Sequence, residues 1–324
     1  MNSFGEKFRV QIYGESHGLG VGIIIDGIPP GIPIHVEDFE HDLTRRRSGH
    51  MGTTTRVESD VPEFLSGVFK YFSTGAPMNI FFRNSDVRSQ DYEDTKLLPR
   101  PGHADFVAHK KFLGFNDYRG GGHFSGRLTA AIVGAGIIAK KLLQPIKIEA
   151  KLIEIGGHTD FEAILETTIQ KNDSVGGLVN CQVLGIPIGW GEPFFNSIES
   201  MISHLVFSIP AVKGIEFGSG FGAAKMFGSE HNDEIISMDG TTQTNYSGGI
   251  NGGLSNGNPI SFNVSIKPTS SISKPQSTID LNTGNINTLE IKGRHDVCIA
   301  LRAPVVIEAM TAIALADLKL VHEI

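Results

Sequence analysis

The sequence contains little cysteine, and its charge balance gives no general attraction for polyanions. Two cysteines among 324 residues, Cys181 and Cys298, stand in dissimilar contexts without a CxxC pair, so neither a disulfide framework nor a zinc site is expected. The formal net charge of −7 argues against a broad basic surface for nucleic acid. Any anionic ligand must therefore be held by local clusters of arginine and lysine.

The chain also has little that would direct it into or across a membrane. The first ten residues carry no basic region followed by an apolar run, so no signal peptide is expected. The most apolar stretch, residues 128–139, is too short to span a bilayer and is followed by Lys140 and Lys141. We therefore expect a cytoplasmic globular protein without a membrane partner.

Two parts of the chain show the same order of predicted strand, Gly-Pro turn and helix. In the first part, an apolar run at 21–25 is followed by GIPPGIP at 27–33 and by helical spacing over 35–47. An alternating strand at 7–13 precedes this part. In the second part, a predicted strand at 178–184 is followed by GIPIG at 185–189 and by helical spacing over 198–206. The pattern raises the hypothesis of an internal duplication, and a chance recurrence explains it equally well.

Other segments indicate the architecture. Residues 127–143 are apolar on nearly every side, as in a helix buried all round. Residues 259–267 alternate like a half-buried strand, and Pro304 can open a last apolar helix. Alternating strands with wholly buried helices predict an α+β fold in which helices are sandwiched between antiparallel β-sheets. Since no flexible linker is evident, we expect a single domain over residues 1–324.

The first candidate for chemistry is GESHG at residues 14–18, between two predicted strands. Its glycines let the backbone come close to a ligand. Ser16 offers a hydroxyl, and His17 offers an imidazole of the kind that exchanges protons near neutral pH. A polar hairpin turn is the alternative interpretation.

A second candidate is the run Arg45, Arg46 and Arg47 at the end of a predicted helix. A helix carboxyl end tolerates cations, so a solvated capping cluster is the default interpretation. Three adjacent guanidiniums can also bind an anion strongly, especially when the rest of the chain is acidic. Helical geometry would point them in different directions, so one or two could face a ligand.

A third candidate is RPGHAD, in which Pro101 and Gly102 fix a turn. This turn places His103 between Arg100 and Asp105, where a carboxylate can orient or charge the imidazole ring. A surface histidine on a loop is the alternative.

Two further segments suit phosphate or flavin. Residues 118–127 place glycines ahead of the buried helix, where exposed backbone amides can hold an anion. Arg127 and Leu128 stand where a P-loop requires Lys-Ser/Thr, so that motif is rejected. Residues 267–271 (KPTSS) combine a lysine, hydroxyls and a proline-fixed turn. Each segment on its own is also compatible with a simple connecting loop.

The last candidate is GRHD at residues 293–296, just before the final helix. It sets Asp296, a carboxylate that could accept a proton, between Arg294 and Arg302. A salt-bridged loop is the alternative interpretation.

Taken in order, these segments resemble the chorismate synthase family over essentially the whole chain. The most specific matches are GESHG with IDGIPPGIP, RRRSGH, RNSDVRSQDY, RPGHAD, DYRGGGHFSGR, KGIEFGSGF, KPTSSI and GRHD. The resemblance implies the same layered fold, usually as a homotetramer, with reduced FMN bound near subunit contacts. It also implies a carbon–oxygen lyase of the shikimate pathway. Its reaction is the redox-neutral anti-1,4-elimination of phosphate from 5-enolpyruvylshikimate 3-phosphate, which gives chorismate.

The resemblance also implies roles for individual residues. His17 corresponds to a histidine beside the departing phosphate, and His103 to one that protonates the reduced flavin near N1. Asp296, with Ser16, corresponds to the pair that relays the proton from N5. The expected cofactor contacts are His123, Phe124, Ser125, Glu230, His231, Gly253, Lys267, Pro268, Thr269, Ser270, Ser271 and Arg294. The expected substrate contacts are Arg45, Arg46, Arg100 and Arg127.

The sequence departs from the family pattern at a few positions. His123-Phe124 stands where the family typically has Arg-Ser, and Ser48 replaces a proline. No reductase domain is evident, so we expect NADPH to act only indirectly, as a source of reducing equivalents. Two alternatives stay open: a flavin- or nucleotide-dependent oxidoreductase, for which no GxGxxG unit is found, and a non-catalytic relative that binds phosphorylated ligands.

Overall fold

The computed structural model describes residues 2–55, 58–85, 96–291 and 295–322. Most strands belong to two larger antiparallel sheets, and several helices accompany them. The mixed α+β class predicted from the sequence is therefore confirmed.

The first sheet comes from the amino-terminal part of the chain. Its antiparallel strands lie in the order β1, β2, β3, β7 and β4. Their bounds are β1 (Ser3–Phe4), β2 (Arg9–Gly14), β3 (Gly20–Asp26), β4 (Glu63–Ser66) and β7 (Met78–Arg83). The predicted strands at 7–13 and 21–25 correspond to β2 and β3. Ile23 pairs with Ile80 across the sheet, and both side chains are buried in the core.

The second sheet comes from the carboxy-terminal half. Its antiparallel strands lie in the order β10, β13, β9 and β8. Their bounds are β8 (Lys147–Ile155), β9 (Gly177–Leu184), β10 (Val212–Phe217) and β13 (Ile260–Ile266). The alternation predicted over 259–267 is confirmed, because Ile260, Phe262, Val264 and Ile266 are buried and the residues between them are more exposed.

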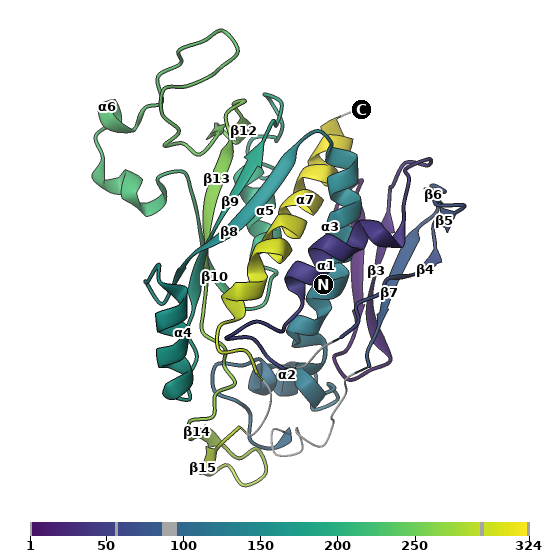
Figure 1. Cartoon of the computed structure of the whole chain (residues 1–324), viewed down its shortest axis with the longest axis vertical. Helices are drawn as coiled ribbons and strands as arrows, with labels where there is room; N and C mark the ends of the chain where they lie inside the picture. Colours follow the sequence, from purple (N-terminus) through teal and green to yellow (C-terminus); the bar gives the residue numbers. More distant parts are fainter. Residues whose placement is uncertain (1, 56–57, 86–95, 292–294, 323–324) are drawn as a thin grey trace.

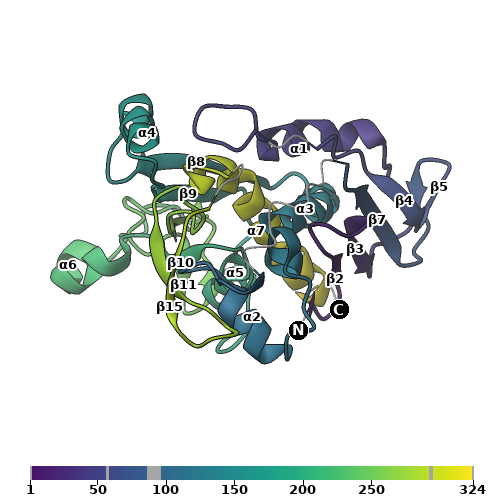
Figure 2. The ribbon, with the colours of Figure 1, turned by 90° about the horizontal axis from the view of Figure 1, so that it is seen from below.

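Two long apolar helices lie between the sheets (Figures 1 and 2). They are α3 (Thr129–Leu143), which packs on β3 and β7, and α7 (Ala303–His322), which packs on β8 and β9. The two helices also contact each other closely. Gly136 permits this approach, because a Cβ atom at that position would lie 2.3 Å from the Cβ of Ala309. Burial on nearly every side explains their almost continuous apolar sequence.

The last helix is preceded by a 3-10 turn, η7 (Ile299–Arg302). Together they are long and apolar enough to cross a membrane, but 78% of the most apolar window is buried inside the fold. These side chains therefore belong to the protein core. The prediction that Pro304 lies near the start of the final helix is confirmed, since α7 begins at Ala303.

The helix predicted over 35–47 is present in two parts. Residues Val36–Phe39 form the 3-10 helix η1, and Glu40–Arg46 form α1. The side chain of Asp38 accepts a hydrogen bond from the backbone N–H of His35 at 2.7 Å and tightens the first turn. The helix predicted at 198–206 coincides with α5 (Ile198–Val206).

Shorter elements complete the described chain. The helical ones are α2 (Asp105–Lys111), α4 (Phe161–Gln170), α6 (Gly228–His231), η4 (Arg119–Phe124), η5 (Gly126–Leu128) and η6 (Gly220–Lys225). The short strands are β5 (Val68–Phe69), β6 (Phe72–Ser73), β11 (Ile250–Asn251), β12 (Leu254–Ser255), β14 (Gln276–Ile279) and β15 (Ile286–Leu289). Residues 218–247, which we call the arm, carry η6 and α6 and project away from both sheets (Figures 1 and 2).

Candidate active site

A cavity of about 740 Å³ lies where loops from both halves of the chain meet. This volume suits a small-molecule ligand or cofactor. The predicted site residues that line the cavity are Arg46, Arg100, His103, His123, Phe124, Ser125, Arg127, Lys267, Pro268, Thr269, Ser270, Ser271 and Asp296. Apolar side chains, including Ile132 from α3 and Met310 from α7, form other parts of the wall.

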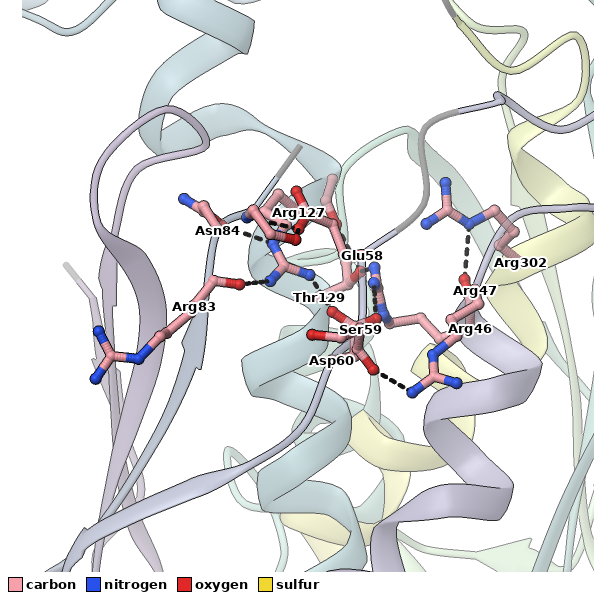
Figure 3. Close-up of polar contacts among 12 residues, drawn as sticks. Arg46, Arg47, Glu58, Ser59, Asp60, Arg83, Asn84, Arg127, Thr129 and Arg302 are labelled. Atoms are coloured by element: carbon pink, nitrogen blue, oxygen red, sulfur yellow. Dashed lines mark hydrogen bonds and ion pairs between the residues drawn. The ribbon is translucent and has the colours of Figure 1, made fainter. Parts of the chain in front are cut away.

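Arg46, Asp60 and Arg127 line one part of this cavity, which we call the cationic wall because it holds two guanidiniums. The Asp60 carboxylate lies between the two arginines. Arg46, at the end of α1, and Arg127, in η5, reach this carboxylate from two sides (Figure 3). Arg46 Nη2 lies 2.5 Å from Asp60 Oδ2, and Arg127 Nη1 donates to Oδ1. Burial alone would raise the pKa of Asp60, but the charges of the two arginines outweigh it and lower that pKa. The carboxylate is therefore ionised between two guanidiniums.

The two arginines differ in how completely the protein satisfies them. Arg127 donates from Nε to Asn84 Oδ1 at 2.8 Å and from Nη2 to the Arg83 carbonyl at 2.9 Å (Figure 3). Arg46 donates from Nη1 to Thr129 Oγ1 at 3.3 Å, whereas its Nε is buried without a hydrogen-bond partner among the described residues. Burial lowers the pKa of Arg46, but guanidinium starts from so high a value that it stays protonated. Arg46 therefore keeps a buried donor for an anionic ligand.

Asp296 lies on the same wall and is held by two donors. The backbone N–H of Thr54 donates to Oδ1 at 2.9 Å, and Arg302 Nη1 lies 3.3 Å from Oδ2. Arg302 also donates from Nε to the Arg46 carbonyl, which ties this carboxylate to the end of α1 (Figure 3). Arg294, another predicted contact, lies outside the described residues.

His103 is oriented by a buried carboxylate. Its Nδ1 lies 2.6 Å from Asp105 Oδ1, so Nδ1 carries the hydrogen and Nε2 is the acceptor of the neutral ring. The guanidinium of Arg100 makes two hydrogen bonds to the same carboxylate and reaches Ser271 Oγ at 3.1 Å, and the Arg100 backbone N–H makes a third. Burial alone would raise the pKa of Asp105, but hydrogen bonds from Arg100 and His103 outweigh it and lower that pKa.

Ser16 and His17 lie directly behind the glycine loop. Gly120, Gly121 and Gly122 all have positive φ, a run of backbone conformations that favours glycine. A Cβ atom at Gly120 would lie 2.5 Å from Cδ2 of His17 and 2.9 Å from Oγ of Ser16. Both side chains are buried, and the residue next to them, Gly120, lines the cavity.

Both ring nitrogens of His123 contact other groups of the protein. The resemblance implies that His123 contacts the cofactor, at a position where the family typically has arginine. In this chain Nδ1 lies 2.8 Å from the Gly14 carbonyl and Nε2 lies 3.2 Å from Asn2 Oδ1. Because a carbonyl oxygen only accepts, Nδ1 must carry a hydrogen that is committed to Gly14. The ring lines the cavity, and its Nδ1 contacts the end of β2, from which the loop with Ser16 begins.

The KPTSS segment forms a polar strip in the cavity lining. Lys267 donates from Nζ to the Gly102 carbonyl at 2.5 Å and to Ser270 Oγ at 3.2 Å. Thr269 Oγ1 is buried without a hydrogen-bond partner among the described residues. Burial and the nearby charge of Lys213 lower the pKa of Lys267. The strip therefore combines a cation with a hydroxyl whose hydrogen-bonding capacity is unfilled.

Arg45 does not join the cavity lining that the structure describes. It makes a bidentate ion pair with Glu308 of α7, with N–O distances of 2.7 and 2.8 Å. Consecutive residues of a helix point about 100° apart, so Arg45 cannot share the direction of Arg46. Arg45 therefore forms a structural ion pair between α1 and α7, and its expected contact with substrate stays a prediction.

Three predicted cofactor residues lie away from the cavity of their own chain. Glu230 caps α6 by accepting from the Phe227 backbone N–H, and His231 Nε2 lies 3.0 Å from Ser219 Oγ. Both residues belong to the arm, which extends away from the sheets (Figure 1). Gly253 lies in the turn between β11 and β12. Within one chain, Glu230, His231 and Gly253 are therefore not among the described residues that line the cavity.

Sequence inspection missed Asp60 and Asn84, both of which contact Arg127. Asp60 lies between Glu58 and Glu63 in the segment that leads into β4, and nothing in the sequence distinguishes it from these acidic neighbours. Asn84 falls within the RNSDVRSQDY segment that carried the family resemblance, but no role was assigned to it. One argument could have pointed to Asp60: if Arg46 and Arg127 are buried, a carboxylate must lie close enough to neutralise part of their charge.

Comparisons with known proteins agree with this geometry. A sequence profile described as chorismate synthase matches residues 8–320. A chorismate synthase of Chitinophaga pinensis is 58% identical, covering 100% of this chain and 98% of the relative, and one of Korarchaeum cryptofilum is 44% identical, covering 97% and 96%. A crystal structure of a chorismate synthase superposes with a TM-score of 0.76 at 27% identity, covering 98% of this chain and 93% of the other. The chain therefore belongs to the chorismate synthase family.

Proposed function

We propose that this protein eliminates phosphate from 5-enolpyruvylshikimate 3-phosphate in an anti-1,4 sense, giving chorismate with reduced FMN as cofactor. Family membership gives the reaction and its place in the shikimate pathway. The observation that carries the proposal is the buried pair Arg46 and Arg127 at the wall of a cavity in a chain of net charge −7. The substrate carries a phosphate and two carboxylates, so an acidic protein must concentrate cations where it binds.

The residues present are compatible with FMN. The cavity is large enough for a cofactor beside a small substrate, and it offers both apolar walls and polar groups. Thr269 Oγ1, buried without a partner among the described residues, and the ammonium of Lys267 would suit the cofactor phosphate. When bound, reduced FMN supplies electron density that assists cleavage of the allylic C–O bond.

The chain's own residues bind charge and move protons. Arg46 and Arg127 hold anionic groups of the substrate. The Nε of Arg46 has no hydrogen-bond acceptor among the described residues, and an oxygen of the substrate would supply one. His17 protonates the departing phosphate. His103, whose tautomer is fixed by Asp105, holds a proton at Nε2 when the ring is charged. Asp296 accepts a proton at a carboxylate oxygen, with Ser16 in the relay.

We also propose a homotetramer in which the arm of a second copy brings Glu230 and His231 to the flavin. The arm exposes Phe221, Phe227 and Met238, each more than three-quarters exposed in one chain. Monomeric soluble proteins rarely leave a large contiguous apolar surface uncovered, so burial against another copy would explain these side chains.

We propose one cytoplasmic domain over residues 1–324, with α3 and α7 sandwiched between two related halves. Support for one domain comes from a single hydrophobic core that includes residues of both sheets and both helices. Support for duplication comes from the repeated order of strand, Gly-Pro turn and helix, in β3 with α1 and in β9 with α5. NADPH enters only through whatever reduces the flavin.

Anaerobic turnover tests the proposed function. Purified protein given dithionite-reduced FMN and 5-enolpyruvylshikimate 3-phosphate should release inorganic phosphate and form chorismate, whereas oxidised FMN should support neither. Substrate binding without phosphate release would favour a non-catalytic relative. Oxidation of NADPH in the absence of substrate would favour an oxidoreductase.

A further inference from the structure

The side-chain amide of Asn84 joins two parts of the site that are far apart in the sequence. Its Nδ2 lies 3.0 Å from the Glu15 carbonyl, 3.1 Å from the Ser16 carbonyl and 3.0 Å from the Gly18 carbonyl. Its Oδ1 accepts a hydrogen bond from Arg127 Nε at 2.8 Å (Figure 3). One amide therefore contacts both the loop that carries Ser16 and a guanidinium of the cationic wall.

The chemistry of this position requires a donor and an acceptor on one short side chain. Carbonyl oxygens only accept, and a guanidinium only donates, so the two ends of the link have opposite needs. A carboxylate would lack the donor, and a hydroxyl would be too short to serve both ends. The backbone N–H of Asn84 also donates to the Leu19 carbonyl at 3.1 Å, which fixes the residue itself at the end of β7.

The loop at residues 15–18 depends on such contacts because it lies between β2 and β3, outside the sheet ladder. Within it, the Gly18 N–H donates to the Glu15 carbonyl at 3.1 Å. From outside, the Ser16 N–H donates to the Gly122 carbonyl at 3.1 Å. The three carbonyl contacts of Asn84 set the side of the loop that faces Arg127.

We infer that Asn84 is a positioning residue of the elimination. It fixes the loop of Ser16 and His17 relative to Arg127, and so fixes the groups that handle protons relative to a cation that binds the substrate. The inference rests on the proposed function of these residues. Correct orientation of reacting groups accounts for a large part of enzymatic rate, and a displacement of about 1 Å can lower a rate about 100-fold.

Two substitutions separate the donor from the acceptor. Asn84→Asp has the same shape and keeps an oxygen for Arg127, but it cannot donate to the three carbonyls. We expect kcat to fall about 10- to 100-fold, with KM changed less than about threefold. Asn84→Ala removes both groups, so kcat should fall similarly and KM should also rise about tenfold, because Arg127 loses a hydrogen bond. The assay is anaerobic phosphate release with reduced FMN over a range of substrate concentrations.

A matched control is Asn180→Asp in β9. The Asn180 amide also donates to a side-chain oxygen, Asn263 Oδ1 at 2.9 Å, but its hydrogen bonds stay within the second sheet and reach neither the loop of Ser16 nor Arg127. This variant should keep wild-type kcat and KM. Asn84→Gln keeps every hydrogen-bonding group and displaces it by one methylene, so it should fold with a wild-type melting temperature and still lose turnover. It therefore tests the inference even if the other two variants do not fold.

The outcomes are distinguishable. An inactive wild-type enzyme under these conditions would overturn the proposed function itself. An active wild type with an unchanged kcat in Asn84→Asp, or with full turnover in Asn84→Gln, would overturn only the positioning role. Loss of kcat in proportion to loss of folded protein would show that Asn84 acts through stability alone, which also contradicts the inference.

Discussion

Neutralising Asp60 should be strongly destabilising, because its carboxylate compensates two buried guanidiniums. In Asp60→Asn one acceptor oxygen becomes an N–H donor that faces an arginine. The Asp60 side chain is 0% exposed, and those of Arg46 and Arg127 are each 4% exposed. Breaking a buried pair by removing one partner costs about 3–5 kcal/mol. We expect that loss in the free energy of unfolding at pH 7, which for a chain of this length corresponds to a melting temperature lower by roughly 4–7 °C.

Equilibrium unfolding in urea measures this loss, and the single tryptophan, Trp190, provides a buried fluorescence probe. The matched control is Asp26→Asn, which breaks an ion pair with Arg9 whose side chains are 37% and 60% exposed. Such a surface pair is worth about 0–1 kcal/mol. Added phosphate should stabilise Asp60→Asn more than the wild type, because an anion can take the place of the carboxylate. If Asp60→Asn loses no more than Asp26→Asn, the account of the cationic wall is wrong.

The pH dependence of the same difference has a definite sign. The folded-state pKa of Asp60 is lowered from an ordinary value of 3.8. Such a group contributes stability above its unfolded pKa and loses that contribution as the pH falls through its folded pKa. The difference between wild type and Asp60→Asn should therefore be constant from about pH 8 to pH 5 and shrink only below about pH 4. A difference that shrinks between pH 7 and pH 5 would point to another titrating group.

Three other substitutions test individual parts of the site. His103→Ala should lower kcat about 100-fold or more with little change in KM, and full activity would remove its assignment as a proton donor. Thr269→Val removes a buried hydroxyl that has no described partner, so urea unfolding should show no loss of stability while the Kd for FMN rises about tenfold. His123→Ala should lower turnover by releasing the Gly14 carbonyl and leave the Kd for FMN within about twofold. A large loss of FMN affinity in flavin titration would show that the ring contacts the cofactor instead.

The sequence predicted those helices and strands in which apolar residues repeat regularly along one continuous segment. Residues 198–206 and 259–267 gave a helix and a strand close to the observed bounds, because burial on one face repeats along each of them. The strand β7, which lies between β3 and β4 in the first sheet, was not predicted. Its neighbours β3 and β4 lie at different distances along the chain, and strand pairing of this kind depends on the tertiary fold.

The direction of Arg46 could have been predicted more sharply. Phe39 and Leu43 are buried, and Arg46 follows them at intervals of four and three residues, so the same helical face points inward. Arg45 falls off that face, in agreement with its pairing to Glu308. The positions of the apolar residues along the helix were thus enough to predict that Arg46, rather than Arg45, points inward.

Asp60 and Asn84 are harder to predict, and the reason lies in what they do. A histidine or an arginine cluster has recognisable chemistry wherever it lies, whereas Asp and Asn are common in turns for local reasons. Their importance here comes from Arg127, which lies 67 and 43 residues away along the chain. The guanidiniums of Arg46 and Arg127 are already buried and oriented before a substrate arrives. Such preorganised charge stabilises developing negative charge without further rearrangement, which mobile surface lysines cannot do as well. The residues that orient the cations are therefore as necessary to the site as the cations themselves.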